Sequence, residues 1–452
     1  MATVYIKTLG CKVNSYDTNA LTHQLKATGW DIVDSPEDAD VSILNSCSVT
    51  TRADRDGRHL LRRFKRQNPD TYVVAAGCSA QTDSDILAKM DEVDLVVPNE
   101  FKQDFEPILK NYFQARDNPP ASKIPFNKPT VKENRQGHFK TTLNLSPSET
   151  TRTRAFIKIQ DGCNGFCSYC IIPYARGQSR SVPIEDVKKE VRRLIDHGVK
   201  EVVFTGIHIG DFGKETDGHQ KDPFVRLLED LLSWPDMIRF RVSSLEPREL
   251  SENLLKAFAI RPELFCNHFH LPLQSGNSRI LKLMRRQYDH QEYADKVAMA
   301  RDYFPKAFFA ADVIPGFPSE TEDEALETEE FIKSTGLHEL HVFPYSKRPG
   351  TSAIRMPGHL SMPVIKERAA RLRALSKDLK KQYLRGCIGQ EADVLWENTT
   401  VDDRYQLGRT PNFVEVLAPI DRGYLAGSMT RIALKGFVSE HRLLGSPILQ
   451  ES

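Results

Sequence analysis

The chain has 452 residues, more than one hydrophobic core usually organises, so roughly two or three domains are expected. Its 62 Lys and Arg residues balance 61 Asp and Glu residues, and the net charge of +1 excludes a global charge excess as a basis for nucleic-acid binding. The amino terminus lacks the blocks of a signal peptide and no apolar run could span a bilayer, so we expect a cytoplasmic protein without a membrane anchor. The eight cysteines then indicate metal or redox use rather than a disulfide framework.

Residues 1–113 predict a doubly wound parallel sheet with three cysteines along one edge. Apolar runs at 4–10, 41–46 and 72–77 alternate with helical patterns at 18–28 and 52–67, which is typical of a βαβ series. The runs lead directly into Cys11, Cys47 and Cys78. Because the carboxyl ends of the strands share one rim, we expect a three-thiolate site there. Thiols that simply pack at strand ends are the alternative.

Residues 114–154 contain scattered Pro, Ser and Lys with little periodicity, and they predict a linker packed over the surface. Residues 155–385 carry six strand-like runs that alternate with helical segments, so an open (βα)6 partial barrel is expected. These runs lie at 155–160, 201–205, 238–243, 268–273, 308–314 and 338–343.

The loop after the first of these runs carries the densest cysteine pattern. In Gly162-Cys163-Asn164-Gly165-Phe166-Cys167-Ser168-Tyr169-Cys170, the spacing C-x3-C-x2-C supplies three soft thiolates from one short segment. A structural zinc site and a cubane iron–sulfur cluster both take four protein ligands, so three thiolates leave one metal position open for a small molecule. An incomplete zinc knuckle and a disulfide with a spare thiol are the alternatives, but no nearby Cys or His completes a zinc tetrad. Cys266 and Cys387 are predicted to be packed thiols.

Other strand ends carry groups suited to a polar cofactor, namely a glycine that permits close backbone approach, a hydroxyl, a carboxylate and an amide. A helix cap or a turn former is the alternative at each position. Tyr169 is predicted to pack around the cofactor and exclude water. The candidates for cofactor binding are therefore Tyr169, Gly206, Ser244, Glu246 and Gln274.

Two histidines and several arginines invite functional interpretations. His268 and His270 alternate along a strand as a metal pair would, but their apolar neighbours favour a structural or pocket-lining role. Arg176 and Arg180 follow the cysteine loop closely and are candidates for contact with a substrate phosphate, with a solvated basic surface as the alternative. Helical patterns at 55–66 and 366–385 are also rich in Lys and Arg, and such helices are usually only solvated. The second has an apolar face at Ile365, Ala369, Leu372, Leu375 and Leu379.

The last segment, 386–452, predicts a small β-barrel, with strand-like runs at 392–396 and 412–417 around Gly408-Arg409-Thr410. Its Asp and Glu residues outnumber its Lys and Arg residues, so strong nonspecific phosphate binding is not expected. Arg409 is nevertheless a candidate contact for nucleic acid.

Three cysteines in an amino-terminal domain followed by C-x3-C-x2-C resemble the radical S-adenosylmethionine (SAM) methylthiotransferase family. The resemblance covers essentially the whole chain, and the tail is similar to the TRAM domain with which relatives bind RNA. Two segments are similar to the branch that acts on N6-threonylcarbamoyladenosine in tRNA: Thr8-Leu9-Gly10-Cys11-Lys12-Val13-Asn14 and Asn45-Ser46-Cys47-Ser48-Val49-Thr50.

The resemblance implies two [4Fe-4S] clusters, an auxiliary one on Cys11, Cys47 and Cys78 and a radical SAM one on Cys163, Cys167 and Cys170. The second cluster would be catalytic, with SAM on its open iron. One SAM would methylate a sulfur carried on the auxiliary cluster, and a second would yield the 5'-deoxyadenosyl radical that takes hydrogen from C2 of the adenine.

The implied enzyme is a tRNA (N6-L-threonylcarbamoyladenosine(37)-C2)-methylthiotransferase that acts on the anticodon stem-loop of tRNA. It needs a reducing electron donor and a sulfur source, and we expect a monomer. The alternatives are a methylthiotransferase for an aspartate of a ribosomal protein, and a noncatalytic iron–sulfur protein that binds RNA or senses redox state.

Overall fold

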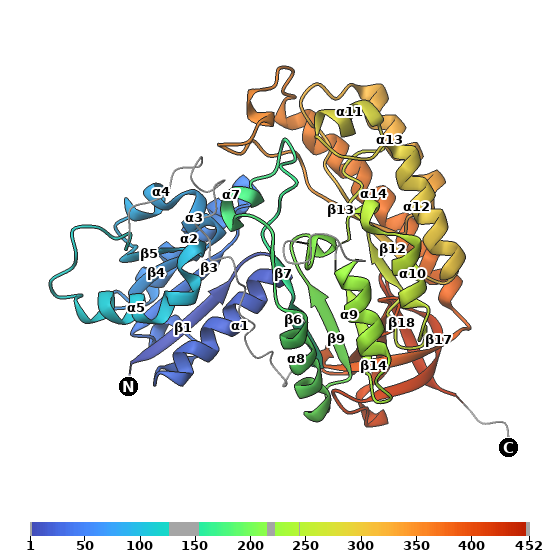
Figure 1. Cartoon of the computed structure of the whole chain (residues 1–452), viewed down its shortest axis with the longest axis horizontal. Coiled ribbons are helices and arrows are strands. Elements are labelled where there is room, and N and C mark those ends of the chain that lie inside the picture. Colours follow the sequence, from blue (N-terminus) through green and yellow to red (C-terminus); the bar gives the residue numbers. More distant parts are fainter. Residues whose placement is uncertain (1, 126–152, 215–221, 244, 449–452) are drawn as a thin grey trace. The chain divides into compact units, whose positions relative to one another are not determined.

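The computed structural model describes residues 2–125, 153–214, 222–243 and 245–448. Contacts within the chain divide it into two compact units (Figure 1). The first unit comprises Met1–Ser148, Lys158–Val182 and Ser346–Arg355, and the second comprises Glu149–Ile157, Pro183–Tyr345 and Met356–Ser452. The loop that carries Cys163, Cys167 and Cys170 therefore belongs to the same unit as Cys11, Cys47 and Cys78. The domain boundaries after residues 113, 154 and 385 stay a prediction.

The first unit is built on a five-stranded sheet in the order β2-β1-β3-β4-β5, and every neighbouring pair is parallel. The strand order reverses at β1 and β3, which makes this edge a topological switch point, where ligand crevices form. The three predicted strands are confirmed, and two shorter ones were not predicted. The strands are β1 (Thr3–Thr8), β2 (Asp31–Val33), β3 (Val41–Ser46), β4 (Tyr72–Gly77) and β5 (Leu95–Pro98).

Helices cover both faces of this sheet because its central strands are apolar on both sides. Ile43 and Val74 pack with residues of α1 (Lys12–Ala27) and α5 (Phe105–Gln114), whereas Leu44 and Val73 pack with α2 (Thr51–Gln67). The short helices α3 (Cys78–Thr82) and α4 (Ser84–Ala88) follow β4. Both predicted helices are confirmed, and α1 starts directly after Cys11.

Only the ends of the predicted linker 114–154 can be compared, because residues 126–152 lie outside the described part of the chain. Near residue 125 the described part contacts the sheet, and its role as a linker stays a prediction. The amide of Val96 in β5 donates to the carbonyl of Lys123 at 2.9 Å, and Ile124 lies against the core below α2.

All six strands predicted between 155 and 385 are confirmed, and they lie in chain order in two three-stranded sheets, β6-β9-β10 and β11-β12-β13. A parallel bridge between Phe240 and Phe265 links the two sheets. The strands are β6 (Arg154–Lys158), β9 (Glu201–Thr205), β10 (Arg239–Val242), β11 (His268–His270), β12 (Phe308–Val313) and β13 (Glu339–Val342).

Helices connect successive strands of this second unit, as the βα pattern predicts. Several of them begin at side-chain caps: in α13 the side chains of Thr321 and Glu324 form a capping box, and Gly336 ends the helix at a φ of +70°. The helices are α8 (Ile184–Asp196), α9 (Pro223–Leu232), α10 (Glu252–Phe258), α11 (Ser278–Leu283), α12 (His290–Tyr303), α13 (Glu322–Thr335) and α14 (Met362–Cys387).

The carboxyl-terminal strands form a closed barrel in the order β14-β15-β16-β18-β17. Its interior contains Val394, Trp396 and Ile432, and Cys387 at the end of α14 packs against the same core. The strands are β14 (Glu391–Val401), β15 (Tyr405–Arg409), β16 (Glu415–Pro419), β17 (Met429–Ser439) and β18 (Arg442–Pro447). Among the described helices, none has the length and apolar character needed to cross a membrane.

Candidate functional site

The strands β1, β3 and β4 place Cys11, Cys47 and Cys78 at one edge of the sheet. The parallel register pairs Thr8 with Asn45 and Ser46 with Gly77, so the three strands end nearly level. Cys11 is exposed, Cys47 is half-buried and Cys78 is buried. Burial, and secondarily the neighbouring sulfur of Cys78, raises the pKa of Cys47 to about 12. The three cysteines therefore lie at the same edge of the sheet, and their joint binding of one cluster stays a prediction.

Glycines turn the chain immediately before two of these cysteines. Gly10 and Gly77 have φ angles of +122° and +89°, which side chains rarely adopt. A Cβ atom on Gly77 would lie 2.4 Å from the carbonyl oxygen of Ser46, so no side chain fits at that position. The sharp turn lets Cys78 start α3 directly at the strand end, beside the loop that carries Cys47.

Asn14, in the first turn of α1, connects the surroundings of all three cysteines. Its Nδ2 donates to the carbonyl of Leu9 at 2.8 Å and to that of Ser46 at 3.1 Å, which ties the end of β1 to the end of β3. Its Oδ1 lies 3.9 Å from the Sγ of Cys78. Asn99 approaches the same sulfur, with Nδ2 at 3.5 Å. These two amides were not predicted as site residues, although Asn14 stands only three positions after Cys11.

The segment Ser346–Arg355 also supports the cysteines of the first unit. Arg348 donates to Asp54 on α2, and Asp54 lies 3.0 Å from the hydroxyl of Ser79. That hydroxyl is 2.7 Å from the carbonyl oxygen of Cys47. In addition, the amide of Ala353 donates to the carbonyl of Ser168 inside the cysteine loop, at 2.7 Å. These contacts join residues far apart in the chain and carry no local sequence signal.

The loop with Cys163, Cys167 and Cys170 is shaped by two glycines. At Gly162, with φ +76°, a Cβ atom would lie 1.9 Å from the carbonyl oxygen of Gln178, so the close crossing of the loop's two ends requires glycine. A Cβ atom on Gly165 would lie 3.3 Å from the Sγ of Cys163 and 3.9 Å from the Sγ of Cys167. The sulfurs of Cys163 and Cys167 therefore both lie near the backbone of Gly165.

The two ends of the loop are fixed by backbone hydrogen bonds. Cys163 donates from its amide to the carbonyl of Gly177 at 3.1 Å, and Cys170 donates to Cys167 at 3.0 Å. The loop follows β6 and β7 (Gln160–Asp161) and leads into α7 (Ile172–Arg176), so it lies at a strand's carboxyl end as predicted. Tyr169 is half-buried within it.

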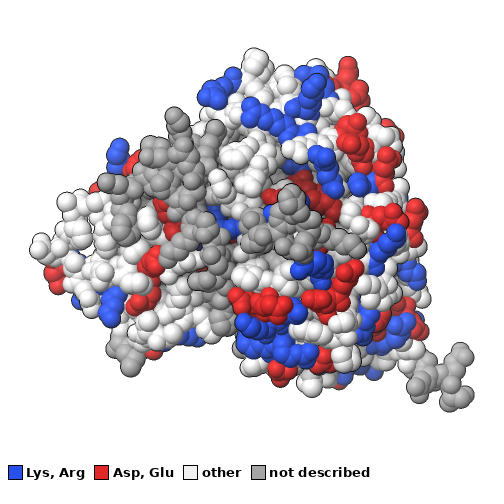
Figure 2. Space-filling model, viewed as in Figure 1, with Lys and Arg blue, Asp and Glu red and all other residues white. Residues whose placement is uncertain are grey.

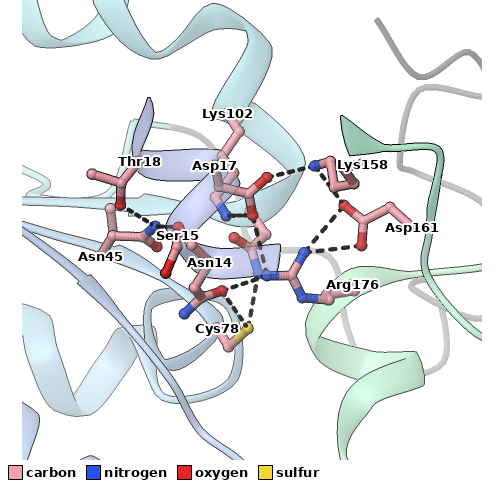
Figure 3. A network of polar contacts seen from close by, with 12 residues as sticks. Asn14, Ser15, Asp17, Thr18, Asn45, Cys78, Lys102, Lys158, Asp161 and Arg176 are labelled. Atoms are coloured by element: carbon pink, nitrogen blue, oxygen red, sulfur yellow. Dashed lines mark hydrogen bonds and ion pairs between the residues drawn. The ribbon is translucent and has the colours of Figure 1, made fainter. Parts of the chain in front are cut away.

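Five charged residues form a buried network between the two cysteine groups of the first unit. Asp17 on α1 accepts from Lys102 at 2.6 Å, from Lys158 at 2.5 Å and from Arg176 at 3.1 Å. Asp161 lies 2.9 Å from Arg176 and 3.1 Å from Lys158. Figure 3 shows the guanidinium of Arg176 between Asp161 on one side and Asp17 and Asn14 on the other. Burial opposes charge on Asp17, but its three cationic neighbours keep its pKa below the usual range.

A cavity of about 140 Å³ opens beside this network. Its walls come from α1, from the segment 99–105 and from both ends of the cysteine loop, and all of them belong to the first unit. Lys102, Lys158 and Arg176 line it together with Asp17 and Asp161. The space is therefore polar and charged on every side that the network reaches.

The prediction that Arg176 faces solvent or a substrate phosphate is wrong. Its side chain is only 2% exposed and is held by Asp161, Asp17 and Asn14. The reason is that long-range partners, 15 to 162 residues away in sequence, enclose it.

Arg180 is 12% exposed and lies 3.5 Å from Asp161. Arg409, on β15, is 15% exposed and contacts Glu397 and Glu415 at 2.8 Å each.

The predicted cofactor-binding residues of the second unit follow β9, β10 and β11. Gly206 comes directly after β9, and Glu246 follows β10, where burial raises its pKa and Arg286 donates to it. Gln274 has a φ of +68° and bridges to Val313, the last residue of β12. These residues thus lie at carboxyl ends of strands, as expected. Ser244 lies outside the described residues.

His268 and His270 do not form a pair. The ring of His268 stacks on Phe308 at 5.5 Å, which matches the structural role that was favoured. His270 instead meets a carboxylate, with Nε2 2.8 Å from Oδ1 of Asp312, and His341 lies 3.1 Å from the same oxygen. This alignment of β11, β12 and β13 was not predicted.

Some of the cations on the basic helices are paired with carboxylates. On α14, Arg368 pairs with Glu320 at 2.7 Å, Arg371 with Glu329 at 2.7 Å and Lys380 with Glu339 at 2.7 Å. Ile365, Ala369 and Leu372 are buried as the predicted apolar face requires. On the face seen in Figure 2, basic and acidic side chains are interspersed.

Cys266 and Cys387 are buried, and burial raises their pKa values to about 12 and about 11, as suits packed thiols.

Two family models match the chain. Residues 3–98 match the uncharacterized protein family UPF0004, and residues 157–332 match the radical SAM superfamily. Among solved structures, the radical S-adenosylmethionine methyltransferase TsrM from Kitasatospora setae, with cobalamin and a [4Fe-4S] cluster bound, matches with a TM-score of 0.57 at 14% identity. The match covers 78% of this chain and 77% of that one, and it shows a shared fold.

Curated relatives extend over nearly the whole length. Threonylcarbamoyladenosine tRNA methylthiotransferase MtaB of Bacillus subtilis is 39% identical over 92% of this chain and 90% of its own. The enzyme of the same name from Aquifex aeolicus is 37% identical over 89% and 95%. The tRNA-2-methylthio-N(6)-dimethylallyladenosine synthase of Syntrophus aciditrophicus is 32% identical over 99% and 95%. With such identity along both units, the chain belongs to the radical SAM methylthiotransferase family, in its threonylcarbamoyladenosine tRNA branch.

Proposed function

We propose that the protein methylthiolates C2 of N6-threonylcarbamoyladenosine at position 37 of tRNA, and so produces 2-methylthio-N6-threonylcarbamoyladenosine. The observation that carries this proposal is the presence of two three-cysteine groups in one unit of a chain whose relatives bear that activity in their names. An unactivated aromatic C–H bond cannot be opened by acid–base catalysis at neutral pH, because no side chain is basic enough. A radical route is therefore required.

The donor chemistry of both groups fits [4Fe-4S] clusters. Such a cluster takes four thiolate ligands, and each group supplies three sulfurs, which leaves one iron of each cluster for a small molecule. Cys11, Cys47 and Cys78 would hold the auxiliary cluster, and Cys163, Cys167 and Cys170 the radical SAM cluster. When bound, the two clusters supply the electron that cleaves SAM and a separate place for the sulfur to be transferred.

The surrounding residues prepare these sites for their ligands. Gly10, Gly77 and Gly162 set the turns next to the cysteines, and a bulkier residue at any of them would displace a ligand. Asn14 and Asn99 present amide groups toward Cys78, and such neighbours orient ligands and adjust the potential of a cluster. The candidates for binding SAM remain Tyr169, Gly206, Ser244, Glu246 and Gln274.

We divide the chain into an amino-terminal domain at 1–113, a radical SAM domain at 155–385 and a carboxyl-terminal domain at 386–452. The closed barrel of the last domain resembles the TRAM domain named above, and we assign part of the substrate binding to it. Arg180 and Arg409 are the candidate RNA contacts, and both keep some exposure. Since the barrel is not basic overall, recognition of the anticodon loop by shape and unstacked bases is favoured over phosphate attraction. A reducing electron donor and a sulfur source complete the reaction, and the protein acts as a monomer in the cytoplasm.

The test is anaerobic reconstitution with iron and sulfide, followed by incubation with SAM, dithionite and tRNA that carries threonylcarbamoyladenosine. Nucleoside mass spectrometry should detect the 2-methylthio product. The variant with Cys163, Cys167 and Cys170 all changed to Ala should lose about four of about eight irons and make neither the product nor 5'-deoxyadenosine. Incorporation of sulfur into a ribosomal protein, with tRNA unchanged, would instead favour the other branch of the family.

A further inference from the structure

Arg176 belongs to the radical SAM segment by sequence but lies beside the auxiliary cysteines. It is the last residue of α7, six positions after Cys170. Its Nη2 donates to the Oδ1 of Asn14, and this same oxygen lies 3.9 Å from the Sγ of Cys78 (Figure 3). The guanidinium is thus one side chain away from an auxiliary ligand.

The other face of the guanidinium is bound to the base of the cysteine loop. Nη1 donates to both carboxylate oxygens of Asp161, at 2.9 and 3.1 Å. Asp161 stands two residues before Cys163, and its Oδ1 also accepts from the amide of Gly162 at 2.8 Å. One side chain therefore bonds a neighbour of each cysteine group, Asn14 beside Cys78 and Asp161 at the base of the cysteine loop.

A parallel connection runs through the backbone next to Arg176. The Nδ2 of Asn99 donates to the carbonyl of Ala175 at 2.9 Å and lies 3.5 Å from the Sγ of Cys78. Cys163 donates to the carbonyl of Gly177 at 3.1 Å. The stretch 175–177 thus bonds Cys163 directly and approaches Cys78 through Asn99. Its backbone and the side chain of Arg176 therefore both hold the two cysteine groups in the same position relative to each other.

The charges of this region do not cancel. Three cations, Lys102, Lys158 and Arg176, face two anions, Asp17 and Asp161, and the half-buried Arg180 also lies 3.5 Å from Asp161, so positive charge is in excess here. Lys102 and Lys158 both bind Asp17, whereas Arg176 is the cation that also reaches Asn14 beside Cys78. Burial opposes the charge of Arg176, but Asp161, followed by the sulfur of Cys78, raises its pKa above the usual range.

We propose that Arg176 is a positioning residue that holds the two cysteine groups at a fixed separation and whose charge raises the reduction potential of the auxiliary cluster. This inference rests on the proposed function, because it takes that cluster as present. Reduction adds a negative charge to a cluster, and a cation in a poorly solvated place stabilises the reduced form more than the oxidised form. The effect should be larger for the auxiliary cluster than for the radical SAM cluster, whose nearby Asp161 offsets the charge of Arg176.

The experiment isolates the auxiliary cluster by changing Cys163, Cys167 and Cys170 to Ala, and then measures its midpoint potential by redox titration with electron paramagnetic resonance. Arg176→Met should shift the potential to a more negative value. Arg176→Lys keeps the charge and should leave the potential near that of the parent. Arg63→Met removes an exposed arginine of α2 that bonds only Gln67 among the described contacts, and it should cause no shift.

The fold should tolerate Arg176→Met, because Asp17 keeps Lys102 and Lys158, and Asp161 keeps Lys158 and Arg180. Should that variant fail to hold iron, Asp161→Asn decides the question, since it removes a negative charge and must shift the potential to a more positive value. The proposal is overturned if Arg176→Met leaves the midpoint potential unchanged, or if Arg176→Lys shifts it as far as Arg176→Met does. It is also overturned if Asp161→Asn does not move the potential. Absence of any auxiliary cluster in the parent protein would instead contradict the proposed function.

Discussion

Gly10 is packed so closely against Cys47 that a Cβ atom on Gly10 would lie 2.8 Å from the Cβ of Cys47 and 3.4 Å from its sulfur. Non-bonded contacts of Cβ atoms in folded proteins essentially never come as close as 2.8 Å. The chain can therefore pass this close to Cys47 just before Cys11 only because Gly10 has no side chain. The arrangement of Cys11, Cys47 and Cys78 therefore depends on a glycine at position 10.

Gly10→Ala should displace Cys47 and lower the iron content of the auxiliary site. Gly29→Ala is a matched control, because Gly29 also has a positive φ, +88°, but a Cβ atom there would have no neighbour within 4 Å. In both variants alanine is strained because the backbone φ is positive, but only in Gly10→Ala does the new Cβ atom also clash with Cys47. Iron determination after reconstitution should give about four irons fewer for Gly10→Ala. Equal iron in the two variants would contradict the assigned role of this contact.

Glu201 on β9 should be a major source of stability in the second unit. It is fully buried and binds Arg239 at 2.7 Å and Arg241 at 3.0 Å. Burial alone would raise the pKa of Glu201, but the two arginines lower it to about 2. Glu201→Gln leaves two buried cations without a charged partner, and the expected cost is about 3–5 kcal/mol in the free energy of unfolding.

Urea denaturation monitored by circular dichroism measures that cost. Glu252→Gln on α10 is the control, because Glu252 pairs with Lys256 at an exposed position, where ion pairs contribute about 0–1 kcal/mol. A similar small loss in both variants would show that the buried pair adds little.

The sequence predicts the elements of this fold better than the contacts between them. Apolar runs identify β1, β3 and β4, whereas β2 has only three residues, none of them buried, so its local pattern is weak. Cysteine positions at strand ends predict their convergence, because parallel strands share one edge. Arg176 was misassigned because a basic residue in a polar stretch normally faces water, and its partners Asn14 and Asp17 lie on α1, far away in sequence. Ion pairs of this kind depend on tertiary structure and leave no periodic signal.

His338 should make the stability of the second unit depend on pH. Its side chain is half-buried and its Nδ1 accepts from the amide of Phe309 at 3.0 Å, and this burial lowers its pKa to about 4. The unfolded chain therefore binds more protons between about pH 6.5 and 4, so the stabilising effect of the neutral ring is lost as pH falls through this window. His338→Gln should remove this contribution.

The free energy of unfolding, measured at pH 7 and pH 5, should fall less in His338→Gln than in the parent protein, by about 2 kcal/mol. His197→Gln, at an exposed helix end, serves as the control and should keep the parental dependence. The same loss of stability on acidification in all three proteins would assign the pH dependence to other groups.

Selectivity for the modified base should be strong. A site built for the threonylcarbamoyl group pairs its carboxylate and amide, and each pocket group left unpaired costs about 1–3 kcal/mol. We expect tRNA that lacks this group, or that carries isopentenyladenosine, to react at least roughly tenfold more slowly, the factor that about 1.4 kcal/mol supplies. Competition assays with the three tRNAs in one mixture measure the ratio directly. Equal rates would leave the family assignment intact and remove the assignment to this branch.

The two cysteine groups do different chemistry, and a comparison of two proteins separates their roles. The variant with Cys11, Cys47 and Cys78 changed to Ala is reconstituted beside the unaltered protein, and both are given SAM, reductant and tRNA with threonylcarbamoyladenosine. Both should release 5'-deoxyadenosine, because the loop of Cys163, Cys167 and Cys170 is complete in each, and only the unaltered protein should form the 2-methylthio nucleoside. Formation of that nucleoside by the variant would contradict the account.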